Sequence, residues 1–301
     1  MDKKNKMFTF LNPEHLAPIR NLELRARLIV EGTIAGLHQS PYHGFSTEFL
    51  EYRPYQTGES TRRIDWRKFA KTDRTVVRIF EDETNLYANI LLDKSASMRF
   101  CSNRLMSKYD YARTLAASLA LILIRQRDAV GLSVFDETMN CFITPHSTNI
   151  QLKIIMAQLD RLEASGSTRC GAALSRLART LKKRGLCIVI SDLFDEPEEI
   201  IRGLRHLRFK KQDVIVLRIA DPMEQDFKHA ASLKIHDLET GEKLSLDPVT
   251  AARFFNQGVA GHHAAIKKAC RELAIDCELI QTNEPFHKAL LRVLDKRRRM
   301  L

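Results

Sequence analysis

Oxygen-bearing side chains alternate directly after a strongly apolar run of the sequence. Asp93, Ser95 and Ser97 form a D-x-S-x-S motif immediately after Ile90-Leu91-Leu92, which has the pattern of a buried strand. Because alternate residues of an extended segment point to the same side, the carboxylate and the two hydroxyls can face one pocket. An all-oxygen ligand set suits a hard cation such as Mg2+, Mn2+ or Ca2+, whereas zinc and copper prefer His and Cys.

Two further polar sets occupy corresponding positions along the chain. Thr168 lies in the segment 166–174, which opens a predicted helix, and Asp192 ends the apolar run 188–192. In an open α/β sheet, ligands bind just beyond the carboxyl ends of the strands. Asp and Ser after a strand are also ordinary turn and helix-cap residues, so a single motif would be weak evidence for a metal site. Three sets at matching places favour a binding site, with the cap interpretation as the alternative.

Together the three sets resemble the metal-ion-dependent adhesion site of von Willebrand factor A domains. The resemblance implies one divalent ion, Mg2+ or Mn2+, shared by Asp93, Ser95, Ser97, Thr168 and Asp192. The third motif departs from the family pattern, since the chain reads Ser-Asp-Leu at 191–193 where many A domains have Thr-Asp-Gly. The loop after Asp192 is therefore expected to be shaped differently.

The charges of these ligands indicate what such a site would bind. Two carboxylates neutralise a divalent ion only formally, and the hydroxyls add no charge, so an Asp or Glu of a partner protein can complete the coordination. The sequence therefore predicts a protein-binding module that is not an enzyme.

A phosphoryl-transfer enzyme is the main alternative, because Asp93 lies at a strand end where Mg2+ can be bound. Phosphatases of the haloacid dehalogenase type need a second acid two residues after the nucleophile, and this chain has Ser95 there. The chain contains neither a G-x-S-x-G elbow nor a Walker A motif, so any ATP chemistry must come from a partner.

The elements that position these residues alternate between strands and helices from about residue 86. Strands are predicted at 86–93, 129–135, 186–192, 214–220 and 277–281, with a shorter edge strand near 139–143. Helices are predicted at 108–126, 150–162, 171–183, 197–207, 250–273 and 285–296. This alternation predicts an α/β fold with a doubly wound, mostly parallel sheet, of von Willebrand A or Rossmann-like type, over 86–301. A hairpin insertion is expected near 232–246.

Residues 1–85 have a different pattern, with a predicted helix at 20–37, a densely charged block, and a strand at 75–81. Interleaved charges can form ion pairs around the only tryptophan, or exposed arginines and aromatics can form an interaction hot spot. The candidate residues are Arg53, Arg63, Asp65 and Trp66. Because Trp66 offers the largest apolar area of any side chain here, we expect it to be buried and to tie this region onto the core.

The charged block contains E-F-x-E-x-R-x-Y-x-x-G-E, R-x-I-D-W and V-R-x-F-E, and then leads into the D-x-S-x-S motif. This arrangement resembles the bacterial family labelled "domain of unknown function 58" over about residues 20–297. A small departure is Glu59, where the family usually has Asp. The resemblance implies a role as an adaptor or chaperone cofactor of a MoxR-type AAA+ ATPase, acting on a client protein.

The composition is that of an ordinary globular protein, with 301 residues, 44% hydrophobic residues and a net charge of +11. The positive charge invites a nucleic-acid or anionic-membrane interpretation. Basic clusters are dispersed along the sequence and no nucleic-acid module is visible, so we expect most of them to be solvated. An acidic protein partner explains the charge equally well. The apolar stretch 115–124 is far shorter than the roughly 20 residues that span a bilayer, and no signal peptide is visible, so we expect a cytoplasmic location.

Overall fold

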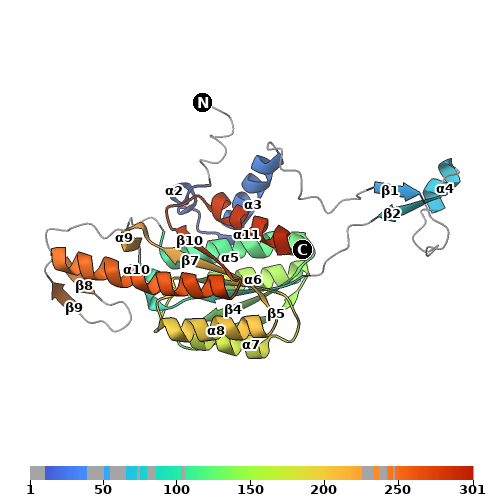
Figure 1. The fold of residues 1–301 in the computed structure, drawn as a ribbon. Helices are drawn as coiled ribbons and strands as arrows, with labels where there is room; N and C mark the ends of the chain where they lie inside the picture. Colours follow the sequence, from blue (N-terminus) through green and yellow to red (C-terminus); the bar gives the residue numbers. More distant parts are fainter. Residues whose placement is uncertain are drawn as a thin grey trace.

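A computed structural model of the chain describes residues 11–38, 51–54, 66–72, 75–79, 86–102, 106–225, 233–236, 243–246 and 248–300. Its centre is a six-stranded sheet with the order β10-β7-β6-β3-β4-β5 (Figure 1). The strands are β3 (Tyr87–Asp93), β4 (Ala129–Phe135), β5 (Met139–His146), β6 (Leu186–Ser191), β7 (Asp213–Ala220) and β10 (Asp276–Gln281). All pairings are parallel except that of β4 with the edge strand β5. The predicted α/β class and the doubly wound, mostly parallel sheet are confirmed.

Helices cover both faces of this sheet. One face carries α3 (Leu22–His38), α5 (Lys108–Arg125), α6 (Asn149–Arg161) and α11 (Phe286–Met300), and the other carries α7 (Cys170–Thr180), α8 (Pro197–Phe209) and α10 (Pro248–Glu272). Strand alternation produces the two cores, since Ile90 and Leu92 pack in the first whereas Leu91 packs in the second. Such two-sided burial explains why the strands read as continuous apolar runs.

The N-terminal helix α3 is part of the first core. Ala26, Ile29 and Val30 are buried in the same cluster as the sheet residues, and α3 packs against α5 and α11. The sequence places this helix in the region 1–85, before the A-like domain. In the structure its apolar face completes the layer of helices over the sheet.

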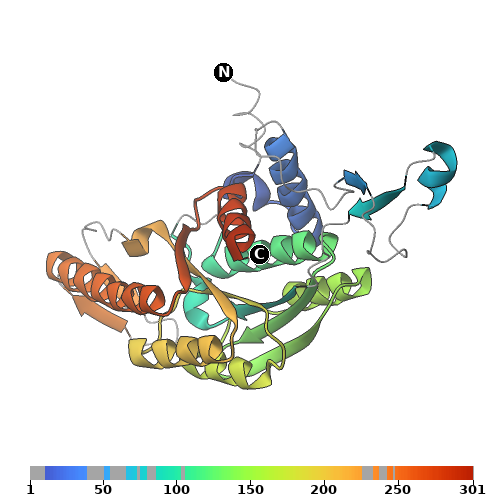
Figure 2. The same ribbon diagram turned by 45° about the vertical axis from the view of Figure 1, so that its right-hand side comes forward.

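The rest of the N-terminal region forms β1 (Glu51–Pro54), which pairs antiparallel with β2 (Val76–Ile79), and the short helix α4 (Trp66–Thr72). These elements lie apart from the six-stranded sheet (Figures 1 and 2). Trp66 is 58% exposed and contacts Phe69 edge-to-face at 6.0 Å between ring centroids. The expectation that Trp66 is buried against the core is therefore wrong, because α4 is carried away from it. Arg53 lies in β1, whereas Arg63 and Asp65 lie outside the described residues.

The exposure of Trp66 makes a direct prediction, since it is the only tryptophan of the chain. We expect acrylamide to quench its fluorescence in the native protein nearly as strongly as in urea-unfolded protein. A native indole that acrylamide cannot reach would show that α4 is covered in solution. If the indole is exposed as expected, a partner that binds this block should protect Trp66 from quenching by acrylamide.

The predicted hairpin insertion forms between β7 and α10. β8 (Leu233–His236) pairs antiparallel with β9 (Lys243–Leu246), and residues 237–242, which connect the two strands, lie outside the described residues. The short helix α9 (Pro222–Gln225) directly follows β7. Within the described part of the chain, no helix is both long and apolar enough to cross a membrane.

Candidate functional site

The first and third predicted motifs meet at the point where the order of strands reverses. β3 and β6 are neighbours in the sheet, and the chain proceeds from β3 toward β4 on one side and from β6 toward β7 on the other. Asp93 is the last residue of β3, and Asp192 directly follows β6. Such a switch point is where open α/β sheets form their binding crevices.

Four of the five predicted ligands form one hydrogen-bonded group. The backbone N–H of Ser95 donates to Oδ1 of Asp93 at 2.8 Å, and the hydroxyls of Ser95 and Ser97 are 3.0 Å apart. Ser97 Oγ donates to Oδ2 of Asp192 at 2.8 Å. Ser191 adds a further bond, from its Oγ to Oδ2 of Asp93 at 2.6 Å. The structure thus brings two carboxylates and their hydroxyl neighbours together from two strand ends.

The loop that carries Thr168 lies beside the first motif. The N–H of Ala96 donates to the carbonyl of Gly166 at 2.8 Å, and the N–H of Ser165 donates to the carbonyl of Lys94 at 2.6 Å. Gly166 has a φ of 77°, in the left-handed region that favours glycine. Thr168 is buried in this loop. The second motif is therefore attached by backbone bonds to the first, as a shared site requires.

A buried ion pair that sequence reasoning missed holds the same loop. Nζ of Lys94 donates to Oδ2 of Asp136 at 2.6 Å and to Oγ of Ser165 at 2.9 Å. The carbonyl of Asp136 accepts from the N–H of Arg169 at 3.3 Å, next to Thr168. Lys94 is a variable position of the motif, so nothing in the local pattern shows that it positions the Thr168 loop.

Lys108 is the second residue that sequence reasoning missed. Its Nζ donates to Oδ2 of Asp192 at 2.8 Å and to Oε1 of Glu224 at 2.6 Å, and the residue is only 1% exposed. Burial alone lowers the pKa of Lys108, but the charges of Asp192 and Glu224 outweigh it and hold the pKa above its usual value. One signal was available: Lys108 begins α5, where the helix dipole disfavours a cation.

The electrostatics of the group fit a hard cation. Burial, and then the nearby charge of Asp192, raise the pKa of Asp93 to about 7. The charges of the two carboxylates therefore repel each other. Lys108 pairs with Asp192 and Glu224, and no ion pair of Lys108 with Asp93 accompanies them in the described part of the chain. No three His, Cys, Asp or Glu side chains of the described residues are grouped for metal binding. A metal here would use hydroxyl oxygens beside the two carboxylates, which suits Mg2+ or Mn2+ better than zinc.

The departure at the third motif has a structural consequence. Leu193 has a φ of 60°, a left-handed conformation that costs a side-chain-bearing residue energy and that glycine adopts freely. Burial of the Leu193 side chain and a 2.9 Å bond from its N–H to Oγ of Ser191 hold it there. The loop thus makes a turn that glycine would favour, although leucine occupies the position.

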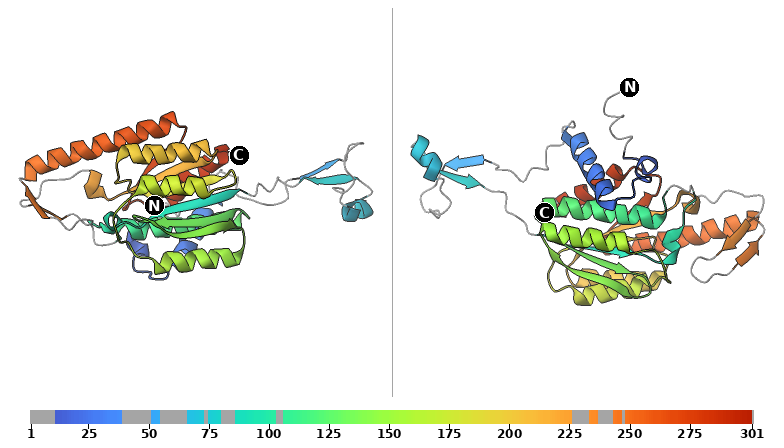
Figure 3. Two further views of the ribbon diagram at one scale, coloured as in Figure 1. Left: turned by 90° about the horizontal axis from the view of Figure 1, so that it is seen from below. Right: turned by 180° about the vertical axis from the view of Figure 1, so that it is seen from behind.

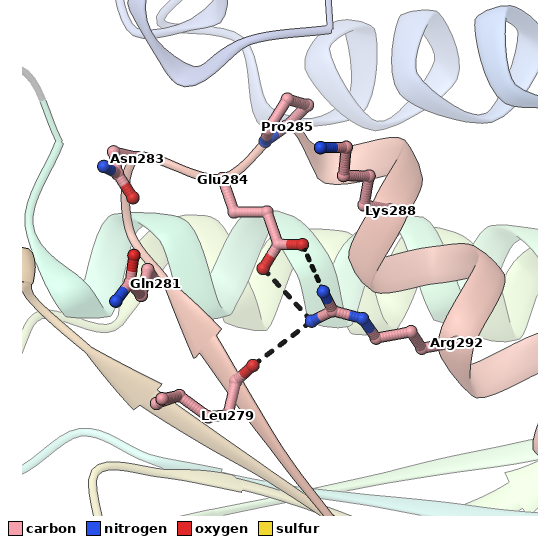
Figure 4. Close-up of a pocket in the computed structure, with 7 residues that line it drawn as sticks. All are labelled: Leu279, Gln281, Asn283, Glu284, Pro285, Lys288 and Arg292. Atoms are coloured by element: carbon pink, nitrogen blue, oxygen red, sulfur yellow. Dashed lines mark hydrogen bonds and ion pairs between the residues drawn. The ribbon is translucent and has the colours of Figure 1, made fainter.

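A separate pocket of about 400 Å³ lies at the end of β10 and the start of α11 (Figure 4). Arg292 crosses it, with an ion pair to Glu284 at 2.6 Å and a bond to the carbonyl of Leu279 at 3.2 Å. None of its lining residues belongs to the three motifs. The Glu284–Arg292 pair joins the turn before α11 to the helix. Because the pocket contains none of the motif residues, the candidate site is the one at the carboxyl ends of β3 and β6.

Two mycobacterial proteins resemble the chain over nearly its full length. They are "Uncharacterized protein Rv1480" of Mycobacterium tuberculosis (strain ATCC 25618 / H37Rv) and "Uncharacterized protein Mb1516" of Mycobacterium bovis (strain ATCC BAA-935 / AF2122/97). Each is 25% identical over 294 residues, which is 96% of this chain and 91% of the relative.

Two solved structures are similar at low identity. "Conserved hypothetical protein BatB" from Bacteroides thetaiotaomicron has 18% identity and a TM-score of 0.48, and the match covers 70% of this chain and 98% of that one. The "SpRpn10 VWA domain" has 13% identity and a TM-score of 0.42, with 69% and 94% covered. The family described as "Protein of unknown function DUF58" matches residues 51–265, well over half of the sequence, and the chain belongs to that family.

Proposed function

We propose that this chain is a metal-dependent protein-binding module rather than an enzyme. The residues that would hold Mg2+ or Mn2+ are Asp93, Ser95, Ser97, Thr168 and Asp192. The observation that carries the proposal is the hydrogen-bonded group of two carboxylates and two hydroxyls at the switch point between β3 and β6. The bound ion would supply a positive charge with an open position for a carboxylate of a partner protein.

The surrounding residues of this chain support a site that is already arranged for binding. Ser191 and the N–H of Ser95 each occupy one oxygen of Asp93, and Lys108 orients Asp192. Hydrogen bonds from neighbouring residues to the ligand side chains fix the orientation of those ligands before a metal enters. The protein therefore would not have to reorganise its ligands on binding.

Catalysis by phosphoryl transfer is less well supported by the same contacts. Each oxygen of Asp93 accepts one hydrogen bond and keeps a second lone pair, which a metal ion could use. The position two residues later is Ser95, whose N–H holds Asp93, and no second acid stands there. These contacts favour a ligand role for Asp93.

The partner class in this proposal is a MoxR-type AAA+ ATPase or its client, with an Asp or Glu that completes the metal site. Resemblance to the family implies this partnership, and the charge balance of the site supports an acidic contact. As an adaptor, the chain would bring a client to the ATPase, and ATP chemistry would belong to the partner. We expect this interaction between the chain, the ATPase and the client to take place in the cytoplasm.

Metal-dependent stability tests the site itself. An ion that binds only the folded state adds RT ln(1 + [L]/Kd), about 2.7 kcal/mol at a hundredfold excess over Kd. We expect Mg2+ or Mn2+ to raise the melting temperature of the wild type relative to chelator, and Asp93→Ala to abolish that rise. Asp160→Ala, which removes an exposed carboxylate on α6, should keep it. Equal melting temperatures with metal and with chelator at matched ionic strength would contradict the proposal.

A further inference from the structure

Two basic clusters that are far apart in the sequence meet at the amino-terminal ends of β6 and β7. α7 and α8 run side by side, and each ends in a turn that leads into the start of a neighbouring strand (Figure 3). Nε2 of Gln212 donates to the carbonyl of Lys183 at 2.7 Å, and the N–H of Asp213 donates to the carbonyl of Gly185 at 2.9 Å. The two turns are therefore adjacent. We give the name basic edge to a set of exposed side chains from these two turns and from the end of α8, namely Lys182, Lys183, Arg184, Arg205, Phe209, Lys210 and Lys211.

The positive charge of the basic edge is only partly neutralised. Asp213 is the one acidic residue of the two turns, and it is shared by Arg184 at 3.5 Å and Arg208 at 3.1 Å. Lys182, Lys210 and Lys211 are exposed and form no ion pair with any residue that the structure describes. The edge therefore presents an excess of exposed ammonium groups whose charge no described carboxylate offsets.

An apolar side chain projects from the middle of these cations. Phe209 is the last residue of α8 and is 83% exposed, more than any other large hydrophobic residue in the described part of the chain. Arg208 precedes it and Lys210 follows it. An exposed phenyl ring between basic residues has the make-up of a surface that contacts both charge and hydrocarbon.

We propose that the basic edge docks on an anionic phospholipid bilayer. Lys182, Lys210 and Lys211 would lie among the anionic headgroups while the ring of Phe209 enters the boundary with the acyl chains. Protein interfaces are depleted in lysine, which disfavours a protein partner as the occupant. Sequence-tolerant nucleic-acid binding uses several aromatic platforms, and Phe209 is the only exposed aromatic among the described residues of this edge.

The proposal goes beyond the proposed function and does not depend on it. The basic edge lies at the amino ends of β6 and β7, whereas the candidate metal site lies at the carboxyl ends of β3 and β6. The two sites therefore lie at opposite ends of the parallel strands of the sheet. A chain docked through the basic edge would therefore turn the candidate metal site away from the bilayer and toward protein partners.

Vesicle sedimentation of the full chain tests the proposal. We expect the wild type to sediment with phosphatidylcholine vesicles that contain phosphatidylglycerol, and not with phosphatidylcholine vesicles alone. Lys210→Glu together with Lys211→Glu should weaken this binding at least about tenfold, because each cation adds to the attraction. Phe209→Ser should weaken it several-fold and leave a strongly salt-dependent remainder.

Matched controls come from α6, which lies on the other face of the sheet. Lys153→Glu reverses an exposed charge there, and Ile150→Ser removes an aliphatic side chain that is 71% exposed. Both should bind the anionic vesicles as the wild type does, and all variants should melt at the wild-type temperature. Absence of binding to anionic vesicles at low salt, or equal binding by the basic-edge variants, would overturn the proposal. If the wild type binds a DNA duplex more tightly than the anionic vesicles, and the basic-edge variants lose that DNA binding, the edge would be assigned to nucleic acid instead.

Discussion

Replacing Lys108 with methionine is expected to lower the free energy of unfolding by about 3–5 kcal/mol in metal-free buffer. The ammonium group joins Asp192 and Glu224, and all three side chains are largely buried. Methionine fills a similar volume but leaves two buried carboxylates without their cation, and an uncompensated buried charge is far more costly than a missing contact. Urea denaturation followed by circular dichroism measures the change.

Two further variants make this result specific. Arg202→Met breaks the exposed pair of Arg202 with Glu199 and should change stability by about 1 kcal/mol or less, because solvent screens such a pair. Adding Glu224→Gln to Lys108→Met should restore part of the lost stability, since one of the two orphaned charges is then removed. If the single variant is as stable as the wild type, Lys108 does not hold Asp192 in the folded protein.

Replacing Thr168 with alanine is expected to weaken chelator-sensitive binding of a MoxR-type ATPase or its client by about 10–100-fold. The cost in stability should be only about 1 kcal/mol, the usual value for one lost hydrogen bond. A metal-bridged contact weakens because the ion loses a ligand that fixes its position and the direction of its open site. Binding and stability should therefore separate in this variant, as measured by titration calorimetry and by thermal melting.

Ser167→Ala is the matched control for this experiment. It removes a hydroxyl from the same loop at an exposed position, one residue before Thr168, and should bind the partner as the wild type does in Mg2+. If Thr168→Ala also binds as tightly as the wild type, and chelator has no effect, the metal-bridge mechanism is wrong. The contact surface would then lie elsewhere, and the block with the exposed Trp66 would be the next place to test.

Much of the fold and the location of the candidate site were predictable because they depend on local patterns. Apolar runs predicted all six strands of the sheet, and α5 is buried nearly all round, as its apolar sequence indicates. Asp93 and Asp192 are each the last residue of a predicted strand. In a parallel sheet the carboxyl ends of the strands share one edge, so placing the motifs in the sequence also placed them in space.

Contacts between distant residues were decided only by the tertiary structure. Lys108 meets Asp192 and Glu224, which are 84 and 116 positions away, and no local periodicity reports such a meeting. The lysines of the basic edge appear scattered along the chain until the pairing of β6 with β7 brings their turns together. Trp66 was expected to be buried because of its size, but burial depends on which surface the chain brings to the indole. Side-chain chemistry and periodicity act over a few residues, whereas packing joins residues across the whole chain, and only the folded arrangement determines which charges and rings meet.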